Sequence, residues 1–398
     1  MSQFRPVLAA GLAVAVTCAF TAAQPAAIGP RVIEIARHKQ QRIHRMAFSP
    51  DGAALAVMGY PLFGGSEVLT LWSVPDGRHL RTFRGDAAGE GFDFSPDGKL
   101  LATPVGKGGE VVICDVASGK ELRRLRHPGV DRVKFSPAGK HLLSDNWRSA
   151  GQKPGDELRV WDYDTGRRVF TAARTRHETP ELIQFATDGR LFFGESYARV
   201  QCWDPTTGAA RPAVRLVPDA DYRVTLSPTG RDVASENTKT SQFHLRDATT
   251  GKIKHDLGRK FVSWMGFTRD GRLLILAIES GRIEVWDTAT GARRSEFTVP
   301  PVPRGATLHA EPFPDGRHLL VQHVYWGNTN LFYDQTTVYT VEGRLVRRAL
   351  DTRDIAFDPS GRSVAVLEGA PVPPGQPGDL RVMLYDAAAW LAGGAKKD

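Results

Sequence analysis

The chain has 398 residues, of which 41% are hydrophobic, 40 are glycine and 26 are proline, and its formal net charge is +8. This is enough apolar material for a large core, and the many turn-forming residues favour short strands over long helices. Lysine and arginine are scattered rather than clustered, which argues against a nucleic-acid-binding surface.

The N-terminus has the layout of a secretory signal peptide. Arg5 precedes an uncharged run of 17 residues, 7–23, which ends in small residues at Ala23. We expect residues 1–23 to be a cleaved signal peptide and residues 24–30 a short linker. The chain is then exported, to the periplasm or out of the cell, with no membrane span after cleavage. A retained membrane anchor is the alternative, because this run is close to the shortest that spans a bilayer.

One pattern recurs eight times along the rest of the chain. A short strand, usually with an aromatic near its end, runs into a Ser-Pro-Asp-Gly type of turn, as in residues 46–52 and 92–98. In such a turn, proline presets φ, aspartate bonds back to its own backbone and glycine takes a positive φ. The turn glycines are spaced 41 to 50 residues apart, at 52, 98, 139, 189, 230, 271, 316 and 361. A near-constant period of this length is typical of the four-stranded blade of a β-propeller.

A second strand follows each turn, and the third strand often ends in Trp-Asp. Examples are LRVWD at 158–162, VQCWD at 200–204 and IEVWD at 283–287, and a Thr-Gly turn commonly follows, as at 165–166. With the first turn, these features resemble the WD40 repeat over about residues 31–386. The periplasmic TolB-type propeller shares the first turn and is the near alternative.

Two departures from the WD40 pattern bear on what the resemblance implies. Tryptophan occupies the third-strand position in only four repeats, and the Gly-His dipeptide that opens many WD40 repeats is missing. We therefore do not expect the His–Ser/Thr–Asp–Trp hydrogen-bond network of that family.

The predicted fold is all-β, a single closed β-propeller of eight four-stranded blades over residues 31–390, with a flexible tail at 391–398. A seven-bladed ring with one irregular repeat outside it is the alternative. No fourth strand follows Asp386, so we expect the strand-like segment 31–35 to complete the last blade and join the two chain ends.

The cysteines do not suggest a disulfide or a metal site. Cys18 lies in the leader, and Cys114 and Cys202 occupy equivalent places in the second and fourth repeats. Blades two apart are not neighbours, so these two thiols are expected to be buried, apolar and unbridged. No CxxC pair is present, and we predict no cofactor.

Long connections between the second and third strands are the expected partner-binding surface. Four of them, at 58–67, 145–157, 323–335 and 368–379, are long, and several carry aromatic residues. Variable loops on a rigid scaffold are a usual place for recognition. The alternative is that these aromatics pack on their own loops. The candidate partner-binding residues are Tyr60, Phe63, Trp147, Tyr325, Trp326 and Phe332.

A second candidate site is the mouth of the central channel. Every residue four positions before the end of a first strand is polar, which predicts either a ligand-binding ring or merely a solvated strand entrance. The candidates are His44, Glu90, Asp131, Glu181, Tyr222, His309 and Arg353, with Ser263 completing the series. His44, His309 and His323, with Glu90 nearby, are the one combination that suggests a metal, but we predict no metal site.

No motif requires enzymatic activity, and we predict no catalytic residues. Residues 194–198 nearly match a nucleophile elbow but lie between two strands rather than before a helix. The predicted function is therefore a non-enzymatic, exported interaction scaffold. It is expected to be a monomer that binds a protein or peptide and no nucleic acid. The alternative is a small-ligand binder or enzyme acting at the channel mouth.

Overall fold

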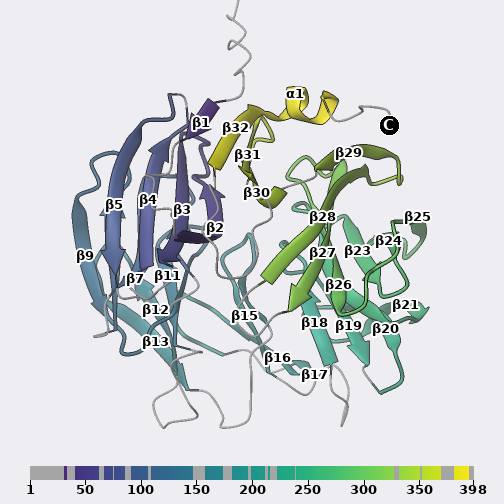
Figure 1. Ribbon diagram of the computed structural model, residues 1–398. Helices are drawn as coiled ribbons and strands as arrows, with labels where there is room; N and C mark the ends of the chain where they lie inside the picture. The colour runs from purple at the N-terminus through teal and green to yellow at the C-terminus, as the bar shows by residue number, and fades with distance from the viewer. Residues whose placement is uncertain are drawn as a thin grey trace, which may run out of the picture.

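The computed structural model describes most of the repeats. It covers residues 31–33, 41–61, 67–74, 76–85, 91–105, 109–146, 157–173, 182–195, 199–210, 214–215, 222–237, 239–326, 331–349, 352–368 and 381–393. The predicted leader and linker, residues 1–30, lie outside these ranges. Figure 1 shows four-stranded sheets that follow one another around a common centre.

The described residues form eight antiparallel four-stranded sheets, of which seven are built from four strands consecutive in the chain. The first strands are β2 (Gln41–Phe48), β6 (Asp93–Phe94), β10 (Arg132–Phe135), β14 (Leu182–Phe185), β18 (Tyr222–Leu226), β22 (Val262–Phe267), β26 (Ala306–Pro312) and β30 (Thr352–Phe357). The second strands are β3 (Ala54–Pro61), β7 (Leu100–Val105), β11 (His141–Asp145), β15 (Leu191–Glu195), β19 (Asp232–Asn237), β23 (Leu273–Ile278), β27 (His318–Trp326) and β31 (Ser363–Glu368).

The third strands include those with the Trp-Asp ending, such as the strands that end at Asp162 and Asp287. They are β4 (Glu67–Ser73), β8 (Glu110–Asp115), β12 (Glu157–Asp162), β16 (Arg199–Trp203), β20 (Gln242–Asp247), β24 (Arg282–Asp287), β28 (Leu331–Thr340) and β32 (Arg381–Asp386). The fourth strands are β5 (His79–Gly85), β9 (Glu121–Arg126), β13 (Arg168–Ala173), β17 (Val214–Arg215), β21 (Ile253–Arg259), β25 (Arg293–Thr298) and β29 (Leu345–Ala349).

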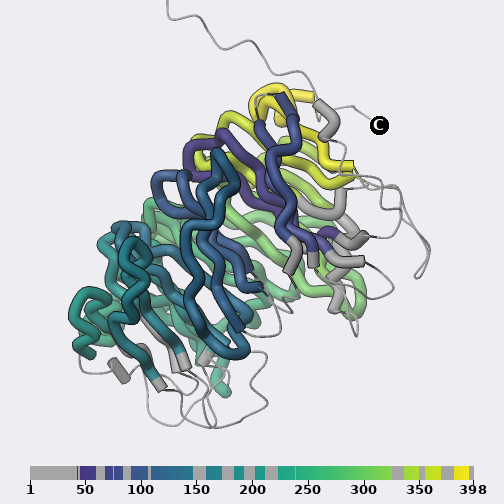
Figure 2. Tube along the Cα trace, turned by 90° about the vertical axis from the view of Figure 1, so that its left-hand side faces the viewer, coloured from purple at the N-terminus to yellow at the C-terminus, as the bar shows by residue number. Residues whose placement is uncertain are grey.

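The N-terminal strand supplies the fourth strand of the last sheet. β1 (Arg31–Ile33) pairs antiparallel with β32, so that Val32 lies opposite Met383. The last sheet therefore has the order β1-β32-β31-β30. In Figures 1 and 2 the beginning and end of the chain, purple and yellow, lie side by side, and β2 lies against β30.

The repeated first turn has the geometry that its sequence predicts. In the first repeat the Ser49 hydroxyl donates to Asp51 at 2.6 Å, and the Gly52 amide donates to the Ser49 carbonyl at 2.8 Å. Gly52 has φ of 71°, in the left-handed region where a side chain would be strained. The turn glycines of all eight repeats have positive φ, so each turn reverses the chain in the same way.

The hydrophobic core lies between sheets rather than within any one of them. Met58 and Leu71 of the first sheet pack with Phe92 and Leu101 of the second. Another cluster joins Met46 of the first sheet to Leu384 of the last. Each sheet thus buries its faces against its neighbours, as expected for strands with apolar residues on both sides.

A short helix closes the described chain. α1 (Ala387–Ala392) begins at Asp386, whose carboxylate accepts a hydrogen bond from the Ala389 amide at 2.8 Å. Trp390 is buried and lies beneath the Arg347 guanidinium, 4.5 Å from the ring centre. The sequence analysis did not predict this helix, and its last two residues belong to the segment expected to be a flexible tail. In the described chain, no helix is long and apolar enough to span a membrane.

Both described cysteines match the expectation of buried, unbridged thiols. Neither Cys114 nor Cys202 is assigned a disulfide bond, and both are buried. Burial raises the pKa of the Cys114 thiol to about 11, so this group stays protonated and poorly nucleophilic at neutral pH.

One sheet contains the hydrogen-bond network that the sequence analysis did not expect. The Ser144 hydroxyl lies 2.7 Å from Nε1 of Trp161 and 2.7 Å from Nδ1 of His127. Three of the four kinds of residue in the His–Ser/Thr–Asp–Trp network, His127, Ser144 and Trp161, therefore meet in the sheet of β10–β13, although the sequence did not indicate it. His127 lies here without a preceding glycine: it directly follows β9, and its amide donates to the Gly109 carbonyl at 2.8 Å. Elsewhere, Trp72 donates to Thr70 and Trp286 to Glu284, each at 2.9 Å.

Removal of the shared hydroxyl should destabilise the fold. Ser144→Ala leaves the buried donor of Trp161 and one nitrogen of His127 without this partner, at a cost of about 1–3 kcal/mol in unfolding free energy. Urea denaturation measures the loss, with the exposed Ser280→Ala as the control. Equal midpoints for the two variants would contradict the assigned role.

Candidate functional site

The first strands of the sheets converge on the centre of the molecule. β6 lies against β10, β14 against β18, β18 against β22, β22 against β26 and β2 against β30. The sequence analysis expected polar residues of these strands to line a central channel, and the positions of the described ones are given below.

The predicted channel-mouth residues lie in these strands or directly before them where the structure describes them. His44, Tyr222 and Arg353 lie in β2, β18 and β30, and their side chains lie outside the described part. Glu90 and Glu181 also lie outside it. Asp131 precedes β10 and is buried, and its amide donates to the Asp145 carbonyl at 2.9 Å.

Several polar side chains of the first strands bond to the next sheet along the chain. Asp93 of β6 accepts a hydrogen bond from the Phe135 amide of β10 at 2.8 Å. Ser263 of β22 lies 2.8 Å from the Leu308 carbonyl of β26. Arg45 of β2 stacks on the Phe92 ring of the second sheet, 4.8 Å from its centre. These side chains hold neighbouring sheets together.

Arg223 makes the most extensive of these links. Its guanidinium donates to the carbonyls of Val262 at 2.5 Å and Ser263 at 2.8 Å, and it lies 3.4 Å from the Glu236 carboxylate. Burial raises the pKa of Glu236, and the charge of Arg223 opposes that rise. A similar pair joins Arg132 to the fully buried Asp145 at 2.5 Å.

His309 is the channel-mouth candidate whose surroundings are best described. It lies in β26 beside the Trp264 ring, with ring centres 6.4 Å apart. Burial lowers the pKa of His309, and the positive charge of Arg223 lowers it further. Its imidazole is therefore held in the neutral form near neutral pH.

The predicted combination of histidines does not converge on one point. Leu308 is the register partner of the buried His323, so His309 lies on the opposite face of the β26–β27 pair from His323. Across the described ranges, no group of three or more His, Cys, Asp and Glu is arranged to hold a metal ion.

The aromatic partner-binding candidates lie at the ends of long strands or outside the described ranges. Tyr60 is near the end of β3, and Phe63 and Trp147 lie outside the described residues. Tyr325 pairs with Phe332 across β27 and β28, and Trp326 ends β27. Much of the segment 323–335, which was expected to be a loop, is therefore an extended hairpin.

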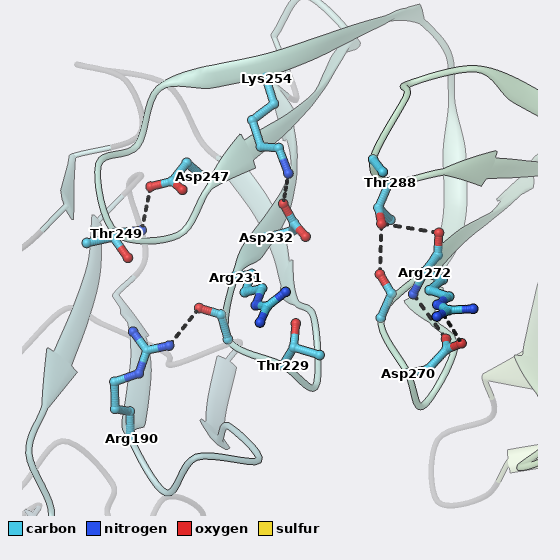
Figure 3. A pocket seen from close by; sticks show the side chains of 13 residues that line it. Arg190, Thr229, Arg231, Asp232, Asp247, Thr249, Lys254, Asp270, Arg272 and Thr288 are labelled. Carbon is cyan, nitrogen blue, oxygen red and sulfur yellow. Dashed lines mark hydrogen bonds and ion pairs between the residues drawn. The ribbon is translucent and has the colours of Figure 1, made fainter.

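A hollow that the sequence analysis missed lies on the face formed by the tight turns. It has a volume of about 720 Å³ and lies among the turns of three consecutive sheets, and its lining includes Arg190, Thr229, Arg231, Asp232, Lys254 and Arg272. Figure 3 shows Arg231 near its middle, with Lys254 and Asp232 above it. The available signal was Thr229, which replaces the usual aspartate of the first turn.

Comparisons with solved structures identify the fold. The C-terminal WD40 domain of Sif2 is similar over 87% of this chain and 96% of that domain, with a TM-score of 0.64 and 13% identity. A eukaryotic initiation factor structure matches 77% of this chain and 78% of that one, with a TM-score of 0.57 and 14% identity. The β-propeller domain of Cps50 (Swd1) from Myceliophteria thermophila matches 75% and 97%, with a TM-score of 0.51 and 16% identity. The fold is therefore that of a WD40 β-propeller.

Sequence relatives match only a short part of the chain. Eukaryotic translation initiation factor 2A of Schizosaccharomyces pombe is 33% identical over 102 residues, which are 25% of this chain and 17% of that protein. Centriole proteome protein 16 of Chlamydomonas reinhardtii is 34% identical over 102 residues, 25% of this chain and 4% of that protein. No protein-family model matches.

The protonation of His309 should make stability depend on pH. Its folded-state pKa lies below the unfolded value of about 6.5, so its contribution is full above that pH and is lost as pH falls through the folded value. The melting temperature of the wild type should fall more between pH 7 and pH 5 than the melting temperature of His309→Gln. An NMR titration of the imidazole gives the folded pKa directly, and a value at or above 6.5 would contradict this account.

Proposed function

We propose that the eight sheets are the blades of one closed propeller. Support comes from the pairing of β1 with β32 and from the cluster that joins Met46 to Leu384, which link the first and last sheets. Core clusters also join other consecutive sheets, such as β22–β25 with β26–β29 through Ile275 and Leu319. Full closure leaves only short sheet edges exposed.

Removal of the closing strand should weaken the propeller. A chain that lacks residues 24–35 exposes the edge of β32, which favours partial opening and self-association. We expect its melting temperature to fall by about 5 °C or more relative to a chain that lacks only 24–29. Calorimetry and light scattering measure the two effects. Equal melting temperatures and two monodisperse monomers would count against closure by β1.

We propose further that the protein is an exported, non-enzymatic scaffold that binds a protein or peptide. The export part rests on the signal-peptide pattern of residues 1–23. The scaffold part rests mainly on one observation. Three described polar side chains of the first strands, those of Asp93, Arg223 and Ser263, are used in bonds between sheets. Side chains that bond one sheet to the next are less available for catalysis. This favours a binding scaffold over an enzyme that acts at the channel mouth.

The partner surface in this proposal is the end of the sheets opposite the tight turns. There the second and third strands are joined by long connections, such as those between β11 and β12 and between β31 and β32. The tight turns at the other end have nearly uniform lengths. Long, varied segments on a uniform frame are where binding specificity commonly resides. Ligand binding at the channel mouth remains the alternative.

The proposal also makes the protein a monomer without a nucleic-acid partner. Its surface cations are interleaved with acids: Arg124 lies 2.9 Å from Glu110 and 2.6 Å from Glu121, and Arg190 lies 2.7 Å from Asp188. Such pairing leaves no broad basic surface among these residues for a phosphate backbone.

The aromatic pair at the end of β27 should be required for partner capture. The bait is the chain from Gln24 onward, and the test variant is Tyr325→Ala/Trp326→Ala. We expect a specific partner in the exported fraction, with capture reduced at least about tenfold in the variant, because aromatic anchors carry much of the binding energy of an interface.

A matched control for this experiment is Arg317→Ala/Arg362→Ala, which alters the tight-turn face. Capture by the control and loss by the aromatic variant would support the loop-face scaffold. Equal capture by all three chains would contradict it. The mass of the exported chain reports whether cleavage follows Ala23.

A further inference from the structure

The eight repeats allow one turn to be compared with its seven equivalents. In seven of the eight turns the residue after the turn glycine is basic: Lys99, Lys140, Arg190, Arg231, Arg272, Arg317 and Arg362. Where an aspartate precedes that glycine, it commonly pairs with the cation. Asp188 lies 2.7 Å from Arg190, and Asp270 lies 3.7 Å from Arg272. In the fifth repeat Thr229 replaces the aspartate, so Arg231 lacks a partner from its own turn.

The other carboxylate next to Arg231 is already neutralised. Asp232 lies 2.5 Å from Nζ of Lys254 and is nearly buried. Within the described ranges, Arg231 forms no ion pair, and its side chain is exposed in the hollow. A guanidinium has five donors, which match the two oxygens of a carboxylate or phosphate.

The hollow is rigid because neighbouring turns touch on both sides of Arg231. Arg190 donates to the Gly230 carbonyl at 3.3 Å, which joins the fourth sheet to the fifth. A Cβ placed on Gly271 would lie 3.2 Å from Oγ1 of Thr229, so the turns of the fifth and sixth sheets are also in close contact. Figure 3 shows Arg190 on one side of Arg231 and Arg272 on the other.

The remaining carboxylates of the hollow are engaged in their own turns. Asp247 accepts hydrogen bonds from the Thr250 amide at 2.7 Å and the Thr249 amide at 3.0 Å. Asp270 accepts from the Thr268 hydroxyl at 2.6 Å. Arg190, Lys254 and Arg272 each form an ion pair with an aspartate, which leaves Arg231 as the lining cation without one within the described ranges.

We propose that this hollow binds an oxyanion, a carboxylate or phosphate carried by a peptide, with Arg231 as the main contact. The exposed Arg272, tied only loosely to Asp270, is the second contact. The site lies on the tight-turn face, so it is separate from the partner surface proposed above. Its volume of about 720 Å³ accommodates a short peptide segment rather than a single ion.

Fluorescence anisotropy with labelled peptides tests this site. The probes are a glutamate-rich peptide, its glutamine counterpart and a phosphoserine peptide, with inorganic phosphate as a competitor. We expect at least one anionic peptide to bind and the glutamine peptide not to bind. Arg231→Gln should weaken binding about tenfold, and Arg231→Lys should restore it only in part, because lysine lacks the two-pronged geometry.

The matched control is Arg317→Gln, which removes the same charge from the equivalent turn position outside the hollow. Unchanged binding by this control supports a built site. Equal weakening by Arg317→Gln and Arg231→Gln would overturn it, because only the overall charge would then matter. Absence of binding by every anionic probe would also overturn it. Stronger binding of the glutamate or of the phosphoserine peptide identifies the oxyanion, and competition by millimolar phosphate alone would exclude a peptide requirement.

Discussion

The architecture depends on the burial of sheet faces between neighbours. A four-stranded sheet such as β22–β25 has a second strand, β23, that is buried along its whole length, so it needs cover on both faces. The clusters around Leu274 and Ile275 provide that cover from the adjacent sheets. No single sheet can therefore hold its conformation alone, and the stability of each repeat is shared with the next.

Near the centre, polar side chains add hydrogen bonds between sheets to this apolar packing. Asp93, Arg223 and Ser263 each bond to backbone atoms of the next sheet, which fixes how neighbouring first strands are placed. A backbone partner is available at every sheet, so different side chains can make the same kind of link.

The tight turns show the opposite behaviour, because aspartate has the same role in the five repeats where it precedes the turn glycine. Aspartate both completes the turn and neutralises the following cation, as Asp188 does for Arg190. Thr229 preserves the turn, since its hydroxyl lies 3.1 Å from that of Ser227, but it cannot neutralise Arg231. One substitution in a repeated element can therefore create a local difference without disturbing the fold.

The sequence by itself determined the repeat, the strand order and the geometry of the turns, because turn chemistry and strand period act over a few residues. It also indicated that the segment at Arg31–Ile33 has no other partner. Only the tertiary structure decided that His127, Ser144 and Trp161 meet, that Trp390 packs in a short helix, and that His309 and His323 lie on opposite faces. These outcomes depend on contacts between distant segments, which local patterns do not encode. The hollow around Arg231 depends on both. The sequence places threonine instead of aspartate at position 229, and the packing of three sheets encloses the hollow.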